Sequence, residues 1–160
     1  MDDQYRTIKD SSSGLFKDRG SKFIAISTPV SNPEEAKQAL EEIKKKYHDA
    51  RHHCFAYRTG TGEYEWRVND DGEPSGTAGK PIMGQIRSFN LTNLIIVVVR
   101  YFGGTLLGTG GLINAYRSAA KDSLGNAVIV SKTIDYTYKL HFPYAAMNDV
   151  MSLIKEENLE

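Results

Sequence analysis

The stretch of sequence that decides the fold runs from residue 70 to residue 111. It begins with DDGEPSGTAGKP (residues 70–81) and ends with LIIVVVRYFGGTLLGTGG (residues 94–111). Two glycine-rich loops therefore flank a run of six apolar residues, Leu94 to Val99. Such a run, rich in β-branched residues, is typical of a strand that is buried on both faces of a sheet. Because polar and glycine-rich segments begin where the apolar run stops, we expect a binding surface at the end of this strand.

Length and composition indicate one well-packed domain with some chain left over. The chain has 160 residues, and its 20 Lys and Arg balance its 20 Asp and Glu. A protein without an overall basic charge binds nucleic acid only through a local patch. Cys54 is the single cysteine, which excludes an internal disulfide and fits a reducing compartment. The sequence shows neither a signal peptide nor a membrane-spanning run, so we expect a cytoplasmic protein that does not bind membranes.

The segment before residue 50 predicts strands and one helix. Ser31 or Asn32 caps the helix, which has proline and glutamate in its first turn and continues to about His48. Its lysine-rich outer face is interpreted as solvated surface rather than as a nucleic-acid site. The other expected elements are strands over residues 4–9 and 23–27, a turn over 11–14 and a charged connector over 16–21.

A β-hairpin is predicted from strands over residues 51–58 and 63–68, joined by a glycine-containing turn. His52 and Cys54 point to the same face of its first strand, because side chains alternate along a strand. No second pair of ligands with zinc-like spacing follows them. No Asn or Asp can be assigned to orient a histidine beside the cysteine. We therefore expect no metal site, no catalytic residues and no cofactor.

Two further helices are predicted around the central strand, over about residues 80–89 and 110–124, followed by a short strand or linker near residue 129. The last segments read as a strand over 133–142 and a helix over 143–157. One strand and one helix cannot bury both of their faces alone. We therefore expect the native chain to continue beyond Glu160. The alternative is that this last pair of elements packs back on the first domain.

The two glycine-rich loops carry the candidate binding residues. Glycines allow positive φ angles and close approach of backbone N–H groups to a ligand, and a helix N-terminus attracts phosphate or carboxylate. Neither loop matches the phosphate loop or the dinucleotide fingerprint. The alternatives are that the glycines only make tight turns and that the acidic residues are solvated turn residues. The candidates are Asp70, Asp71, Glu73, Gly79, Lys80, Arg100, Tyr101, Gly103, Gly104, Gly108, Gly110, Gly111 and Arg117.

Both quoted stretches, followed by Leu112, Ala115 and Tyr116, closely resemble the Impact family, in particular its bacterial YigZ-like branch. The resemblance implies an Impact amino-terminal domain over residues 1–130 and the beginning of a truncated ferredoxin-like carboxy-terminal domain over 131–160. It also implies an α+β fold like the second domain of ribosomal protein S five. In that fold a mixed sheet has two helices packed on one face, and here an incomplete ferredoxin-like unit follows.

The resemblance also implies a function. Eukaryotic Impact proteins regulate translation by competing for a partner in the amino-acid starvation response, and the family has no established catalytic residues. The chain is therefore expected to be a non-catalytic regulatory or binding module linked to translation or stress. Its expected partner is RNA, the ribosome or a translation-associated protein, bound through the glycine-rich loops.

Three hypotheses about those loops stay open. In the first, Lys80, Arg100 and Arg117 contact phosphate or acidic groups. Tyr101 and Phe102 then stack on a base if they are exposed, and belong to the core if they are buried. In the second, the chain is an enzyme that acts on a phosphorylated small molecule, with the acidic cluster of residues 70–73 as a metal or base site. In the third, the loops only shape a protein-interaction surface, which an exposed apolar patch beside Tyr101 would favour.

Overall fold

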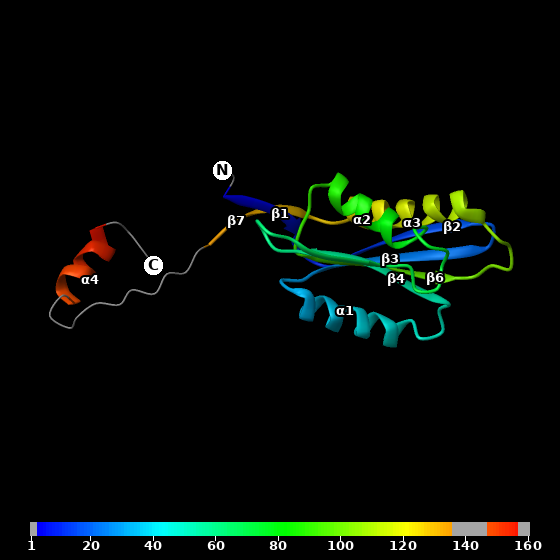
Figure 1. The fold of residues 1–160 in the computed structure, drawn as a ribbon, viewed down its shortest axis with the longest axis horizontal. Helices are drawn as coiled ribbons and strands as arrows, with labels where there is room; N and C mark the ends of the chain where they lie inside the picture. The colour runs from blue at the N-terminus through cyan, green and yellow to red at the C-terminus, as the bar shows by residue number, and fades with distance from the viewer. Residues whose placement is uncertain (1–2, 136–146, 157–160) are drawn as a thin grey trace.

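The computed structural model describes residues 3–135 and 147–156. A five-stranded sheet has the order β2-β3-β6-β4-β5, and a two-stranded sheet pairs β1 with β7. Helices α2 and α3 cover one face of the large sheet, and α1 covers the other (Figure 1). The elements are β1 Gln4–Ile8, β2 Ser12–Asp18, β3 Ser21–Pro29, α1 Pro33–Lys46, β4 His52–Thr59, β5 Glu65–Asn69, α2 Gly79–Ser88, β6 Leu94–Tyr101, α3 Gly108–Gly125, β7 Ile129–Thr133 and α4 Met147–Glu156.

The central strand β6 is buried on both faces, as its apolar run predicts. It pairs with β3 on one side and with β4 on the other. Ile96 and Val98 pack in the core under α2 and α3, whereas Val97 and Val99 pack in the core under α1. This division follows from the alternation of side chains along a strand. The strand therefore supplies both hydrophobic cores of the domain.

The α+β class is confirmed, and so are two helices packed together on one face, namely α2 and α3. The prediction of a mixed sheet is wrong, because every strand pairing in the five-stranded sheet is antiparallel. Strands β3 and β4 do run parallel to each other, but β6 lies between them and pairs with both in the opposite direction. The crossover through α1 therefore produces no parallel neighbours.

Local signals explain helix α1. Asn32 accepts a hydrogen bond from the Glu35 N–H at 2.9 Å, and the Glu35 carboxylate accepts one from the Ser31 N–H at 2.9 Å. This arrangement resembles a capping box, except that the Glu35 carboxylate accepts from the residue before the N-cap rather than from Asn32 itself. Leu40 and Ile43 then bury the inner face of the helix against the sheet. The predicted start and face of this helix are confirmed.

The predicted turn over residues 11–14 and connector over 16–21 are wrong, because most of this segment is the edge strand β2. The turn is predicted partly because glycine, here Gly14, is common in turns. A Cβ at Gly14 would collide with the α3 backbone around Ser123, so this glycine permits close packing of a strand on a helix. The chain reverses instead at Arg19 and Gly20, which have φ angles of 47° and 83°.

The two-stranded sheet brings together the two ends of the described segment 3–135. Strand β7 pairs antiparallel with β1, with Ile129 opposite Ile8, and it continues past the predicted boundary at residue 130. Residues 136–142 of the predicted last strand lie outside the described residues. Helix α4 falls within the predicted range 143–157. None of the helices in the described ranges has the length and apolarity that a membrane-crossing helix needs.

Candidate functional site

The first glycine-rich loop meets the end of the central strand in a buried ion pair. Arg100 is the penultimate residue of β6, and its Nη1 donates to both carboxylate oxygens of Glu73, at 2.8 Å and 2.7 Å. The two side chains are 5% and 4% exposed. Removing either partner of such a pair leaves an uncompensated buried charge. The pair therefore ties the loop over residues 70–79 to the sheet.

Three more side chains surround Glu73. From α3, the Tyr116 hydroxyl donates to Oε2 of Glu73 at 2.6 Å. From β4, the Nε2 atom of His52 lies 3.3 Å from Oε1 of Glu73. The Cys54 thiol, also on β4, lies 3.3 Å from the Tyr116 hydroxyl and 3.1 Å from the Asp70 carbonyl oxygen. One carboxylate thus joins the first loop to β4, β6 and α3.

The thiol and the phenol of this network are neutral. Burial raises the pKa of the Cys54 thiol and of the Tyr116 hydroxyl well above their ordinary values. A thiol of this kind is a poor nucleophile, because the thiolate is the reactive form. The chemistry of the network is therefore that of a rigid support rather than of a nucleophilic site.

Asp70 organises the start of α2. Its carboxylate accepts hydrogen bonds from the N–H groups of Gly76 at 3.0 Å, Ala78 at 3.1 Å and Gly79 at 2.8 Å. Partial burial by itself would raise the pKa of Asp70. The three N–H donors and the charge of Lys80 outweigh it and hold the pKa below its ordinary value. Asp70 therefore caps the N-terminus of α2, although it lies in the preceding loop.

Asp71 is exposed and holds the loop against β4. Its Oδ2 accepts from the His53 N–H at 2.7 Å, and its carbonyl oxygen lies 2.7 Å from Nδ1 of His52. Asp71 and Gly72 both adopt positive φ, at 41° and 87°. Among the described residues, no group of three or more His, Cys, Asp or Glu side chains is placed to hold a metal ion.

The second glycine-rich loop packs on the β2–β3 turn. The Gly103 N–H donates to Oγ of Ser21 at 3.1 Å, and the same Oγ lies 3.4 Å from Nη2 of Arg100. A Cβ at Gly103 would collide with the backbone at Gly20 and Ser21. Glycine is therefore required at Gly103 by the close approach of two loops.

On either side of Gly103 the loop exposes an apolar side chain to solvent. Phe102 is 38% exposed and Leu106 is 83% exposed. Gly104 and Gly108 have positive φ with open space around the Cβ position. The remaining two candidate glycines, Gly110 and Gly111, lie in the first turn of α3, which begins without a side-chain cap.

The three predicted cations do not form one cluster. Burial and the Glu73 pairing exclude Arg100 as a direct phosphate contact and make it a structural residue. Lys80 is exposed at the start of α2. Arg117 is exposed on α3, where its Nη2 donates to Oδ1 of Asn114 at 3.2 Å and where Lys121 lines the same shallow hollow. Lys80 and Arg117 stay predictions as binding residues.

Tyr101 belongs mainly to the structure of the domain. It is half-buried against the core under α1, and its hydroxyl donates to Oδ1 of Asp49 at 2.9 Å. Sequence reasoning missed Ser21, His52, Cys54 and Tyr116 as partners of the loops. Tyr116 stands in the motif of the family resemblance, but nothing local identifies its partner Glu73, which lies 43 residues away in the chain.

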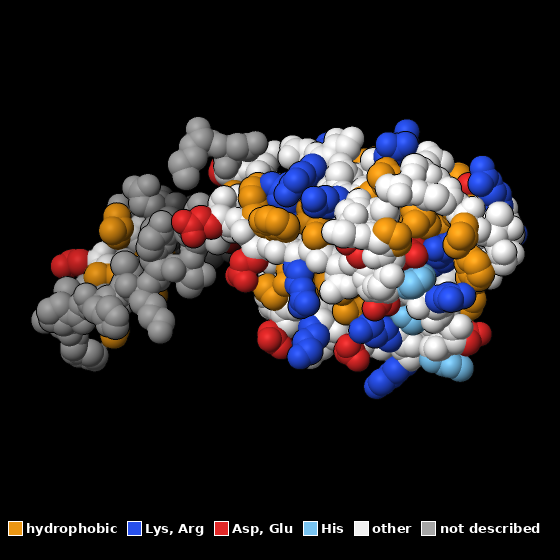
Figure 2. Space-filling model, turned by 45° about the vertical axis from the view of Figure 1, so that its right-hand side comes forward, with side chains coloured by type: hydrophobic (Ala, Val, Ile, Leu, Met, Phe, Trp, Pro, Cys, Tyr) orange, Lys and Arg blue, Asp and Glu red, His pale blue; other side chains and the backbone are white. Residues whose placement is uncertain are grey.

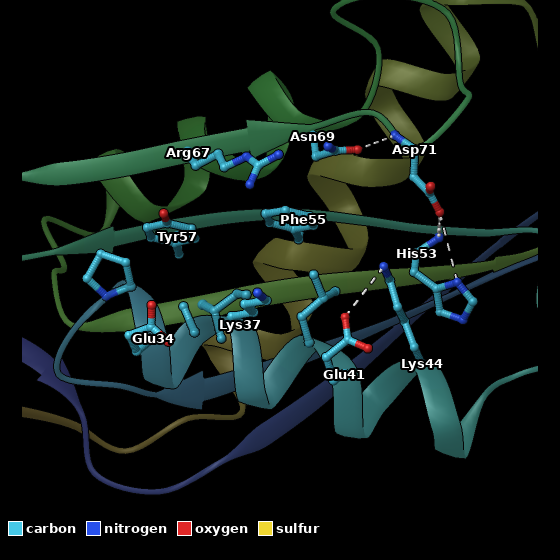
Figure 3. A pocket seen from close by; sticks show the side chains of 14 residues that line it. Glu34, Lys37, Glu41, Lys44, His53, Phe55, Tyr57, Arg67, Asn69 and Asp71 are labelled. Atoms are coloured by element: carbon cyan, nitrogen blue, oxygen red, sulfur yellow. Dashed lines mark hydrogen bonds and ion pairs between the residues drawn. The ribbon is translucent and has the colours of Figure 1, made fainter.

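A separate groove of about 400 Å³ lies between α1 and the β4–β5 hairpin. Phe55 and Tyr57, with ring centroids 6.4 Å apart, line it. Figure 3 shows side chains of α1 facing side chains from the hairpin across the groove. The charged side chains among them are of both signs: Glu34, Lys37, Glu41, Lys44, Arg67 and Asp71. The groove therefore offers no preference for an anionic ligand.

Comparison with known proteins places the chain in a family. The model of the Impact N-terminal domain matches residues 19–124. The chain is 37% identical over 142 residues to the IMPACT family member YvyE of Bacillus subtilis, covering 84% of this chain and 65% of that protein. It is 37% identical over 136 residues to the IMPACT family member YigZ of Escherichia coli, covering 84% and 67%.

A solved structure shares the fold. A crystal structure of a hypothetical protein superposes with a TM-score of 0.81 at 29% identity, covering 98% of this chain and 77% of the other. The chain spans about two thirds of the length of the two bacterial relatives. The match of the domain model, the identity to the bacterial proteins and the shared fold agree. This chain belongs to the Impact family, in its bacterial branch.

Proposed function

We propose that this chain is a non-catalytic binding module linked to translation, and that the surface of its second glycine-rich loop docks a ribosomal or translation-associated protein. The link to translation comes from the Impact family, whose eukaryotic members regulate it. The choice of a protein partner comes from one observation. Phe102 and Leu106 are exposed apolar side chains of this loop. Of the two arginines beside the Phe102 ring, Arg100 is buried and neutralised by Glu73, which leaves Arg51 as a single exposed cation rather than a basic cluster.

The support beneath this loop suits a docking surface. The bonds of Ser21 to Gly103 and Arg100 hold the base of the loop, and the Glu73 network holds the sheet end behind it. A surface that is already ordered loses little conformational entropy on binding. An exposed leucine and phenylalanine on a rigid base therefore contribute apolar contact area at low cost.

The enzyme hypothesis gains no comparable support. Glu73 does lie beside the strand that leads into the second loop, as that hypothesis requires. Its two oxygens already accept from Arg100 and Tyr116, and the Asp70 carboxylate accepts three backbone N–H groups. Internal bonds of this kind leave these carboxylates poorly placed to act as a base.

The test is co-sedimentation of the chain with bacterial ribosomes, together with pull-down of purified translation factors. Leu106→Ala is expected to weaken the association at least about fivefold, as truncation of a contributing interface residue does. Apolar docking is also expected to persist between about 50 and 200 mM salt, where binding dominated by phosphate contacts falls steeply.

The matched control is Leu15→Ala, which truncates a leucine that is 46% exposed on the edge strand β2. It is expected to leave the association unchanged. The proposal is wrong if Leu106→Ala and Phe102→Ala bind every ribosomal fraction and factor as tightly as the unmodified chain does. It is also wrong if no fraction or factor binds.

A further inference from the structure

A surface at the other end of the sheet combines arginines with exposed aromatic rings. Two hollows of about 290 and 510 Å³ share Arg58 and Tyr64 in their walls. The larger is lined by these two residues with Trp66 and Arg87, and the smaller adds Arg6. We call Arg6, Arg58, Tyr64, Trp66 and Arg87 the arginine–aromatic surface.

The rings of this surface are open to solvent rather than part of the core. Trp66 is 56% exposed and Tyr64 is 44% exposed. The guanidinium carbon of Arg58 lies 3.6 Å from the centroid of the Tyr64 ring, and that of Arg87 lies 5.6 Å from the centroid of Trp66. Each ring is thus held beside a planar cation, which fixes its orientation while leaving much of its area accessible.

The arginine–aromatic surface carries a local positive charge, although the net charge of the whole chain is zero. Within the described part of the chain, no carboxylate pairs with Arg6, Arg58 or Arg87, and none lines either hollow. Arg6 donates to the Phe89 carbonyl oxygen at 3.2 Å. A guanidinium carries five N–H donors, so each of these arginines keeps donors for a ligand.

Side chains alternate between the two faces of the sheet along β5, and this separates the arginine–aromatic surface from the neighbouring Glu65. Trp66 lies on the face of the sheet that α2 covers, as its contact with Arg87 of that helix shows. Glu65 and Arg67 therefore lie on the opposite face. In Figure 2, Lys and Arg side chains lie among hydrophobic ones on the upper left of the main body, whereas basic and acidic side chains alternate along its lower edge.

We propose that the arginine–aromatic surface binds single-stranded nucleic acid. Arginines without internal counter-ions attract the phosphates, and exposed rings provide platforms on which unpaired bases stack. A duplex hides its bases from such rings, and an acidic peptide offers charge without a series of flat partners. The combination of features therefore favours a single strand over either.

This site is independent of the protein-docking surface proposed above. Arg58 pairs with Leu94 at the start of β6, whereas His52 pairs with Arg100 near the end that leads into the second glycine-rich loop. Six residues of strand at about 3.3 Å each separate the two ends by about 20 Å. Substitutions at one end therefore do not reach the other.

Trp66 is the only tryptophan of the chain, so its fluorescence reports directly on stacking. We would titrate the full chain with an oligouridylate of about 12 nucleotides, within the usual range of single-strand sites. The expected result is quenching of Trp66 that weakens as salt rises. A duplex of the same length and inorganic polyphosphate of matched charge are expected to quench it little.

Variants are compared by the anisotropy of a labelled oligouridylate. Trp66→Ala is expected to raise the Kd about 5- to 150-fold, whereas Trp66→Phe, which keeps a ring, recovers most of the affinity. Arg87→Ala is expected to lower the slope of log K against log salt by about 0.7. Arg67→Ala is the matched control, because it removes an exposed arginine one position away on the opposite face, and it is expected to bind as the unmodified chain does.

Four results would overturn the proposal: no binding of the oligouridylate at low salt, unchanged affinity in Trp66→Ala, equal losses in Arg67→Ala and Arg87→Ala, or equal competition by polyphosphate or an acidic peptide. Thermal unfolding of each variant separates lost binding from lost folding. Leu106→Ala should bind the oligouridylate with unchanged affinity. A failure of the protein-docking surface is therefore distinguishable from a failure here.

Discussion

At the scale of single residues, Glu73 holds the two glycine-rich loops in place. It sits in a loop, yet it is buried and accepts from Arg100 and Tyr116. The hydrogen bonding of Arg100 is incomplete, because its Nε is buried without a partner among the described residues. Burying charged groups is costly unless they are paired. The stability of this end of the sheet therefore depends strongly on one carboxylate.

Glu73→Gln tests this dependence. The variant leaves the Arg100 charge buried and uncompensated, so the free energy of unfolding is expected to fall by about 3–5 kcal/mol, measured by urea denaturation. The control Glu63→Gln changes an exposed glutamate and should shift it by less than about 0.5 kcal/mol. A loss in Glu73→Gln no larger than in the control would contradict the role assigned to the ion pair.

At the scale of elements, the start of helix α2 depends on a residue nine positions upstream. Its N-cap residue is Ala78, whose methyl side chain cannot accept a hydrogen bond from the helix N–H groups. The loop folds back so that the Asp70 carboxylate supplies the missing acceptor for the N–H groups of Ala78 and Gly79. The first glycine-rich loop is therefore a capping device for the helix as well as a surface.

The pH dependence of stability should show this capping. The folded-state pKa of Asp70 lies below its ordinary value of 3.8, so ionised Asp70 stabilises the fold above that value, and the contribution is lost as the pH falls through the lower, folded-state pKa. Asp70→Asn keeps a polar side chain of the same size but removes the negative charge beside the N-terminus of α2, and it is expected to lower the free energy of unfolding by about 1 kcal/mol at neutral pH.

The difference between Asp70→Asn and the unmodified chain should shrink as the pH falls below about 4, because Asp70 is protonated first in the unfolded chain and then, through its lower pKa, in the folded one. Urea denaturation of the two chains at each pH measures it. A difference that stays constant over this range would show that the charge of Asp70 does not stabilise α2.

At the scale of the whole molecule, the chain before the large sheet and the chain after α3 close one core together. Ile8 of β1 is buried in the core under α2 and α3, and Ile129 of β7 packs against the same core. The two strands pair along their full length. Residues 129–133 therefore belong structurally with the core under α2 and α3.

Ile8→Ala tests this closure. It removes a buried branched side chain, so the free energy of unfolding is expected to fall by about 2–5 kcal/mol in a single cooperative transition. Urea denaturation followed by Trp66 fluorescence and by far-ultraviolet circular dichroism measures it. A separate early transition confined to β1 and β7 would show that these strands form an independent unit.

The sequence by itself determined the central strand, the three helices around it, the β4–β5 hairpin and the family. These features follow from local patterns: an unbroken apolar run, the Asn32 and Glu35 cap, helical spacing and turn residues. Such signals act over a few residues, so they can be read without knowing the rest of the fold. Gly14 shows the limit, because the same residue type that favours a turn also permits close packing.

Only the tertiary structure decided the antiparallel sheet, the burial of Arg100 and the exposed rings of the arginine–aromatic surface. Each depends on segments far apart in the chain. Arg100 and Glu73 are 27 residues apart, and Trp66 meets Arg87 across a strand–helix contact. Whether a charge is paired or a ring is exposed depends on what lies next to it in space. Local spacing carries no information about those neighbours, because long-range strand pairing and packing choose them.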